Sequence, residues 1–134
     1  MVRLILAGVA LAACAMPAWG QERMSREQTF HRSGSAGQEL RVFTYGRWHQ
    51  DCTAMEPPQL VLRTAPAHGT VSFRPGPTRS TRLREGAPDC TGNIYPGLGV
   101  WYVPTPGFHG VDQFEWDVIG GTSISHDSAV VEIR

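Results

Sequence analysis

Residues 100–118 read VWYVPTPGFHGVDQFEWDV, and this stretch limits the folds that the chain can adopt. Its first four residues continue a run from Gly99 that is apolar on both faces, as in a central strand. Two prolines and two glycines then interrupt the chain and predict a tight turn. Beyond the turn, Phe114, Trp116 and Val118 alternate with polar residues, which is the period of a strand with one dry face. The stretch therefore predicts two strands joined by a turn.

Strand character extends outward from this stretch in both directions. No segment of ten or more residues keeps the 3.6-residue period of a helix, and turn-forming residues separate nearly all the predicted strands. About seven short strands within about 100 residues are typical of an antiparallel β-sandwich, and a small barrel is the alternative. The predicted strands are Glu39–Tyr45, Gln59–Thr64, Gly69–Arg74, Thr78–Arg84, Gly99–Val103, Gln113–Ile119 and Ser128–Arg134.

Three fragments of the carboxy-terminal half resemble a known family. Residues 101–116 are similar to an aromatic strand followed by Pro-x-Pro-Gly-Phe-x-Gly-x-Asp-x-Phe-x-Tyr, with Trp116 where that family usually has Tyr. Residues 66–71 (PAHGTV) resemble its Pro-x-His-Gly-x-Val turn, and residues 128–133 resemble its last strand. The family is that of the bacterial Ig-like, cadherin-like (VCBS-type) domains of large surface proteins. The resemblance covers the chain from Gln59 to its end, and it implies an all-β, antiparallel Ig-like sandwich of about seven strands.

The residues of this motif are suited to structural roles. Its prolines fix φ and end the preceding strand, while its glycines permit tight or left-handed backbone. We expect Asp112 to accept hydrogen bonds from the backbone of its own turn, and Phe108 to plug the end of the sandwich. Two further aromatic residues supply large buried areas. The motif comprises His68, Gly69, Pro104, Pro106, Gly107, Phe108, Gly110, Asp112, Phe114 and Trp116.

The chain departs from the family in copy number. Such domains commonly occur as tandem repeats, but the sequence has one copy and no internal repeat. Stacking along a long adhesin is therefore not available to it. We expect the domain to work alone or through a partner.

The amino terminus has the pattern of a secretory signal peptide over residues 1–20. One positive charge at Arg3 precedes an apolar run over residues 4–13, and small residues lead to a cleavage site near Gly20. The apolar run is too short to span a bilayer. Leu-Ala-Ala-Cys ending at Cys14 resembles a bacterial lipobox, so a lipid anchor at that cysteine is the alternative. The expected location is the periplasm or the extracellular space, and that of a lipoprotein in the alternative.

Two cysteines remain after the leader is removed. Cys52 and Cys90 form an even pair in a chain sent to an oxidising compartment, which predicts one disulfide. A reactive Cys52 with His49 as its partner is the alternative hypothesis.

Residues 21–37 are polar and carry no sustained period, so they predict a flexible lead-in to a single domain over residues 38–134.

Composition argues against several classes of partner and cofactor. The 12 basic residues are all arginine and balance 12 acidic residues, so the usual charge signature of a nucleic-acid-binding protein is missing. The five histidines show neither His-x-His nor His-x-x-x-His spacing, and the acidic residues are dispersed. The sequence therefore predicts no metal, no calcium and no cofactor.

The sequence also lacks the patterns of common hydrolases. Gly-x-Ser-x-Gly is absent, and the contiguous His126, Asp127 and Ser128 cannot fold onto each other as a triad. Glu115 and Asp117 share one strand face without any sign of an enclosing cleft, so we interpret them as a solvated surface. We predict a protein that is not an enzyme.

One cluster of charge suggests a binding role. Four arginines occur in an eleven-residue stretch and could meet an anionic glycan, a lipid headgroup or an acidic protein face. A solvated loop protected from edge pairing by charge is the alternative. The overall expectation is an exported, non-enzymatic Ig-like module that binds an envelope protein or glycan or has a structural role. A small inhibitor or effector of one partner protein and an unrecognised hydrolase are the alternatives. The arginines are Arg74, Arg79, Arg82 and Arg84.

Overall fold

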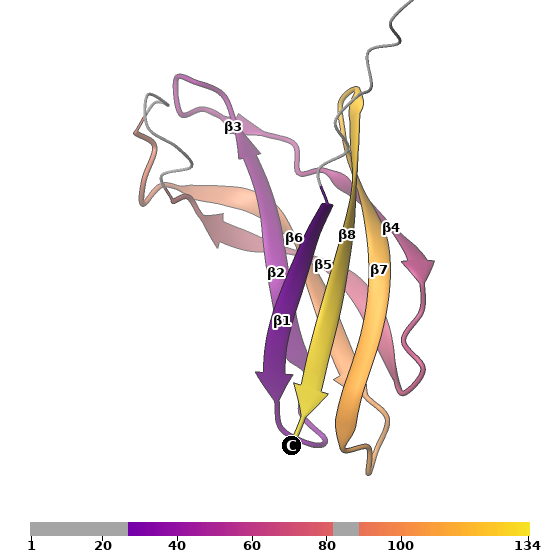
Figure 1. Cartoon of the computed structure of the whole chain (residues 1–134). Helices are drawn as coiled ribbons and strands as arrows, with labels where there is room; N and C mark the ends of the chain where they lie inside the picture. Colours follow the sequence, from indigo (N-terminus) through magenta and orange to yellow (C-terminus); the bar gives the residue numbers. More distant parts are fainter. Residues whose placement is uncertain (1–26, 82–88) are drawn as a thin grey trace, which may run out of the picture.

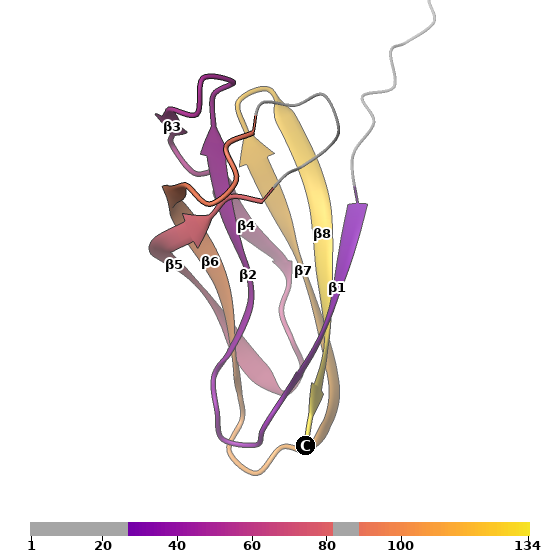
Figure 2. The ribbon, with the colours of Figure 1, turned by 90° about the vertical axis from the view of Figure 1, so that its left-hand side faces the viewer.

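A computed structural model describes residues 27–81 and 89–134, and it is an all-β fold in which these residues form no helix. The two sheets lie face to face as a sandwich (Figures 1 and 2). The predicted all-β sandwich is therefore confirmed. Its strands are β1 (Glu27–Gly34), β2 (Leu40–Trp48), β3 (Ala54–Met55), β4 (Gln59–Thr64), β5 (Gly69–Arg79), β6 (Ile94–Pro104), β7 (Gly110–Gly120) and β8 (Ser123–Ile133).

The strand order matches that of an immunoglobulin sandwich. One sheet has the order β3-β2-β6-β5 and the other has the order β1-β8-β7-β4. Counted along the chain, β2-β6-β5 and β8-β7-β4 correspond to the B-E-D and G-F-C strands of that fold. One pair departs from the antiparallel prediction, because β1 runs parallel to β8 from Glu27↔His126 to Gly34↔Ile133.

Strand β1 corrects the prediction of a flexible lead-in over residues 21–37. Residues 27–34 form an eight-residue ladder with β8, and only residues 21–26 of the lead-in lie outside the described residues. The strand is anchored by Phe30, which is buried and stacks on Phe43 and Trp116 at centroid distances of 4.8 and 5.9 Å. Backbone pairing and one aromatic anchor thus hold a segment that lacks sequence alternation.

The core lies between the sheets and follows the predicted alternation. Phe114 and Trp116 of β7 are fully buried, and so are Val100 and Tyr102 of β6. Strand β6 lies between β2 and β5, which confirms that Gly99–Val103 belongs to a central strand. The remaining buried members of the core are Phe30, Val42, Leu60, Ala129, Val131 and Ile133.

Most strands are longer than predicted, with β6 beginning at Ile94 and β8 at Ser123, and the list of strands differs in two further places. Residues 78–84 were expected to form a separate strand, but β5 continues without interruption to Arg79 and pairs with β6 to its end. Pro75 and Pro77 lie within this strand, and β5 can tolerate them because it is an edge strand. The short strand β3 was not predicted, since two residues carry no periodic pattern.

Gly69 permits a close approach between β5 and β6 that an alanine would obstruct. A Cβ atom there would lie 2.5 Å from Cε2 of Tyr102 and 2.6 Å from the carbonyl oxygen of Val103. We expect Gly69→Ala to lower the free energy of unfolding by about 1–3 kcal/mol, the usual cost of overpacking. Gly76→Ala on the same strand is the matched control, since its Cβ would meet nothing within 4 Å. Urea denaturation of both variants tests this, and equal stabilities would contradict it.

Candidate functional site

The motif residues form a polar joint between two turns. Asp112 is buried at the start of β7, and its carboxylate accepts hydrogen bonds from the backbone N–H groups of Ala67 and His68 at 3.0 and 2.9 Å. It also accepts a hydrogen bond from the hydroxyl of Tyr102 at 2.9 Å. The expectation that Asp112 caps its own turn was therefore wrong apart from its bond to the neighbouring Gln113 amide. The aspartate instead ties the turn before β5 to β7.

The rest of the motif shapes the adjacent turn. The N–H of Phe108 donates to the carbonyl of Thr105 at 3.0 Å, and Gly107 has a φ of 82°, as the third position of a type II turn requires. The ring of Phe108 stacks on His68 at 4.4 Å and packs against the edge of the core. These contacts give the motif a structural role at one end of the sandwich.

The turn between β2 and β3 lies at the other end, away from the C-terminus (Figure 1), and it carries a disulfide. Cys52 and Cys90 are bonded with a Cα–Cα distance of 5.4 Å, as the sequence predicts. The bond joins the turn after β2 to the chain between β5 and β6. We call this region, comprising residues 47–55, 78–81 and 89–95, the stapled end.

The stapled end has a small core of its own on the outer face of the sheet. Tyr95 is buried beneath Trp48, with ring centroids 5.0 Å apart, and its hydroxyl donates to the carbonyl of Cys52 at 2.8 Å. Buried Ser80 bonds to the carbonyl of Cys90. Cys52 has a φ of 68°, a conformation that a non-glycine residue adopts only when its surroundings impose it. The staple therefore holds this part of the chain in a fixed shape.

The four predicted binding arginines do not form one cluster in the described residues. Arg74 and Arg79 lie five residues apart on β5 and so face opposite sides of the sheet. Arg74 already has two partners. Its Nη1 lies 2.8 Å from Oε2 of Glu39, and its guanidinium carbon lies 5.0 Å from the ring centroid of Trp101. Arg82 and Arg84 lie outside the described residues. Of the two predicted arginines that the structure describes, Arg79 lines the groove described next and Arg74 does not.

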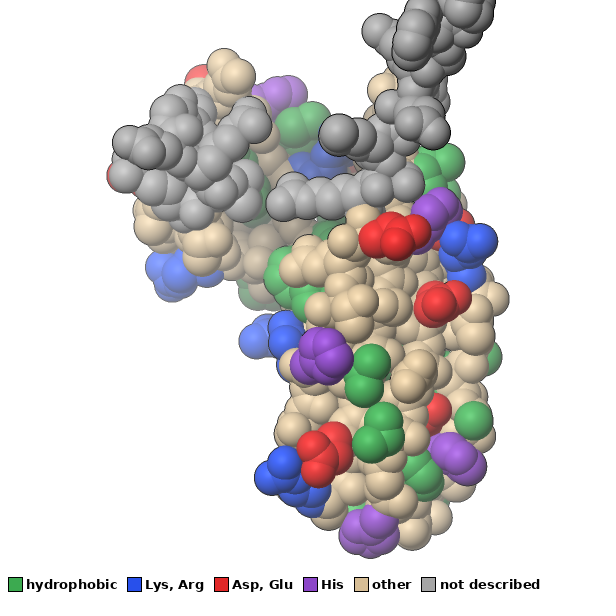
Figure 3. All heavy atoms as spheres, viewed as in Figure 1, with side chains coloured by type: hydrophobic (Ala, Val, Ile, Leu, Met, Phe, Trp, Pro, Cys, Tyr) green, Lys and Arg blue, Asp and Glu red, His purple; other side chains and the backbone are tan. Residues whose placement is uncertain are grey.

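A groove of about 520 Å³ lies beside the stapled end. Figure 3 shows the hollowed surface next to β1, with hydrophobic and arginine side chains gathered around it. Strands β1, β2, β5 and β6 all contribute residues to it. The lining residues are Arg32, Arg41, Val42, Phe43, Thr44, Pro77, Thr78, Arg79 and Ile94.

Three guanidinium groups border this groove, from β1, β2 and β5. Among the described residues, Arg32, Arg41 and Arg79 make no ion pair with a carboxylate. Sequence reasoning missed Arg32 and Arg41, because the first lies in the supposed lead-in and the second on a strand far from the arginine-rich stretch. The fold gathers these charges through the β1–β8, β2–β6 and β5–β6 pairings.

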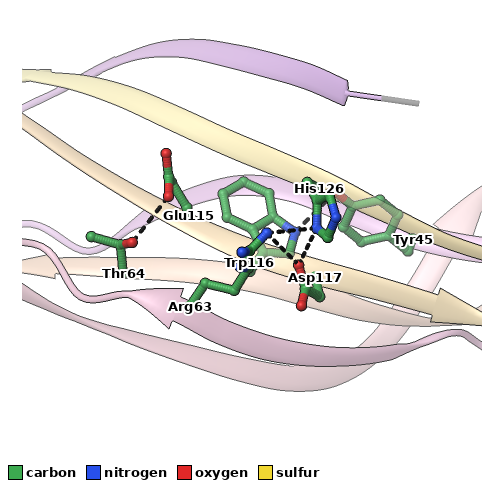
Figure 4. Close-up of polar contacts among 7 residues, drawn as sticks. All are labelled: Tyr45, Arg63, Thr64, Glu115, Trp116, Asp117 and His126. Carbon is green, nitrogen blue, oxygen red and sulfur yellow. Dashed lines mark hydrogen bonds and ion pairs between the residues drawn. The ribbon is translucent and has the colours of Figure 1, made fainter. Parts of the chain in front are cut away.

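A second polar cluster lies on the outer face of the β7–β8 sheet (Figure 4). Nδ1 of His126 lies 2.5 Å from Oδ1 of Asp117, which is 3.5 Å from Nη1 of Arg63. Glu115 on the same face accepts a hydrogen bond from Thr64. These are cross-strand surface pairs, each with a partner on β4 or β8.

His126, Asp127 and Ser128 are contiguous in the sequence, but their side chains have different partners. Asp127 points inward and accepts a hydrogen bond from Tyr45 at 2.5 Å, while Ser128 contacts Thr29 at 2.9 Å on the outer side. Trp116 donates to the Tyr45 hydroxyl at 3.1 Å. Burial and the adjacent Asp127 carboxylate raise the pKa of Tyr45 far above its ordinary value. The hydrogen bond between Tyr45 of β2 and Asp127 of β8 therefore links the two sheets.

Comparison with known proteins leaves the family open. No protein-family model matches the chain, and a search of curated proteins found no match. In the described ranges, 27–81 and 89–134, no group of three or more His, Cys, Asp or Glu could hold a metal ion. No helix in the same ranges is long and apolar enough to cross a membrane.

Proposed function

We propose that the protein is an exported, non-enzymatic Ig-like module that binds an anionic ligand of the bacterial envelope or extracellular space. The observation that carries this proposal is the groove, which three arginines border without a carboxylate partner among the described residues. Arginine forks suit carboxylate and phosphate groups. A concave site beside a rigid support is where ligands bind in folded domains.

Export and family membership are parts of the same proposal. The signal-peptide pattern of residues 1–20 and the alternative anchor at Cys14 lie outside the described residues, and the Cys52–Cys90 disulfide suits an oxidising compartment. The Ig strand order supports the sandwich fold that the resemblance to bacterial cadherin-like domains implies.

A second candidate is a small inhibitor or effector that binds one partner protein through the stapled end. The observation in its favour is the exposed turn at residues 49–53, which the disulfide and the positive φ of Cys52 hold in one conformation. A rigid exposed loop contacts a partner with little ordering cost.

Retention on an envelope fraction tests the leading proposal. The mature protein, an Arg41→Ala/Arg79→Ala variant and an Arg74→Ala control are passed separately over immobilised envelope material at 0.1 M salt. We expect the wild type and the control to be retained, and the double variant to elute early. Equal retention of all three would contradict binding through the groove. Hydrolysis of an ester, peptide or glycoside panel, lost on one substitution, would overturn the non-enzymatic part.

A further inference from the structure

We infer that the groove takes an anionic amphiphile, whose phosphate or carboxylate head meets the arginines while its apolar tail lies on the groove floor. The inference rests on the proposed function and names the chemistry of its ligand. It is drawn from three properties of the groove: cations at the border, exposed apolar residues in the lining, and a β2 carbonyl that already accepts a side-chain hydrogen bond.

The arginines at the border are oriented without being neutralised. Arg32 donates from Nε to the carbonyl of Val42 at 2.8 Å and from Nη1 to the carbonyl of His31 at 2.9 Å. Arg79 donates from Nη1 to the carbonyl of Gly92 at 2.9 Å. Carbonyl oxygens hold a guanidinium in place but leave its net charge, and the remaining N–H groups stay available to a ligand. Arg41 adds a third positive charge from β2.

Part of the groove lining, which we call the floor, is apolar and open to solvent. Ile94 is 56% exposed and Phe43 is 37% exposed, and Pro77 is the third apolar residue of this part of the lining. Removing such surface from water contributes about 25 cal/mol per Å². The floor therefore favours a ligand that brings a hydrocarbon tail together with its charge. A small inorganic anion would contact the arginines and leave the floor exposed.

An extended peptide fits the groove less well. A peptide that added to a sheet would need free backbone groups along β1 or β2. At this position the Nε of Arg32 already donates a hydrogen bond to the carbonyl of Val42. The stacked rings of Phe30 and Phe43 fill the space between the two strands. Strand addition would break both contacts. The same residues leave the head and tail positions of an amphiphile accessible.

Calorimetric titration with three probes tests the inference. The probes are dodecyl phosphate below its micelle concentration, inorganic phosphate, and dodecyl maltoside, which has the same tail on a neutral head. We expect dodecyl phosphate to bind at least about tenfold more tightly than either other probe, because only it engages both parts of the groove. Dodecanoate is a fourth arm and distinguishes a carboxylate head from a phosphate head.

Surface variants separate the two parts of the site. We expect Arg79→Ala to weaken dodecyl phosphate binding about tenfold, the effect of losing one charge-assisted contact. Ile94→Ser should weaken it severalfold while leaving the weak binding of inorganic phosphate unchanged. Arg74→Ala, on the opposite face of the same strand, is the matched control and should bind as the wild type does. Circular dichroism and thermal melting confirm that each variant is folded.

Two outcomes would overturn the inference. Equal affinity for dodecyl phosphate and dodecyl maltoside would show that the charge of the head group does not contribute to binding. A loss of affinity in the Arg74→Ala control equal to that in Arg79→Ala would place the site elsewhere. If envelope retention requires Arg41 and Arg79 but no amphiphile binds, the proposed function stands and the ligand chemistry is wrong. If dodecyl phosphate binds but retention is independent of these arginines, the proposed function fails instead.

Discussion

The Cys52→Ala/Cys90→Ala variant is expected to lose about 4 kcal/mol of its free energy of unfolding. The disulfide closes a loop between positions 38 residues apart, and on the chain-entropy estimate a loop of this length restricts the unfolded chain by about that amount. A loss of this size is a large share of the stability of a small domain. Urea denaturation of the oxidised wild type and the double variant measures the difference.

Reduced wild-type protein provides the control for this prediction. Because reduction breaks the same bond without changing side-chain volume, its stability should fall close to that of the double variant. The bond itself is checked by thiol titration of the denatured, unreduced mature protein. Two free thiols in that titration would contradict the disulfide, and a stability loss below about 1 kcal/mol would contradict its predicted contribution.

Asp112→Ala is expected to lower the free energy of unfolding by about 3–5 kcal/mol. The substitution leaves the amides of Ala67 and His68 and the buried hydroxyl of Tyr102 without their acceptor, and each such unpaired group costs about 1–3 kcal/mol. Asp117→Ala, which removes a carboxylate from the outer face of the same strand, is the matched control and should cost less than about 1 kcal/mol. Equal losses in the two variants would contradict the role given to the joint.

The stability of the fold should also depend on pH through Asp112. Burial raises the pKa of its carboxyl, but hydrogen bonds from Tyr102, His68, Gln113 and Ala67 together outweigh burial and hold the pKa below its ordinary value. A lowered folded-state pKa stabilises the fold above the unfolded-state pKa of about 3.9, and this contribution is lost as pH falls through the folded value. Wild type should therefore lose more stability between pH 6 and pH 2 than Asp112→Asn. Parallel losses would contradict this assignment.

Some strands were predictable because their sequence records which face is buried. In β7, Phe114 and Trp116 alternate with polar residues, and the structure buries both completely. Strand β1 offers no such record, since Phe30 is its only large apolar residue. Its partner is β8, and Thr29 contacts Ser128 at a separation of 99 residues. The sequence of a parallel edge strand that is held mainly by backbone hydrogen bonds has no alternation from which the strand can be predicted.

The candidate site was less predictable than the fold, for a geometric reason. Arg79 and Arg74 were grouped by closeness in sequence, although an odd separation on one strand sends them to opposite faces. Sequence alone did not reveal that β5 continues through Pro75 and Pro77, which an edge strand tolerates. Arg32 reaches the groove through long-range strand pairing, which no local pattern encodes.

The location of the bound ligand is the most direct test of the binding groove. Side-chain Nε–Hε resonances of the mature protein are followed by NMR during titration with dodecyl phosphate. The groove predicts saturable shifts at Arg32, Arg41 and Arg79, together with the backbone amide of Ile94. Shifts confined to Arg74 and the Trp101 indole, or to the turn at residues 49–53, would contradict it.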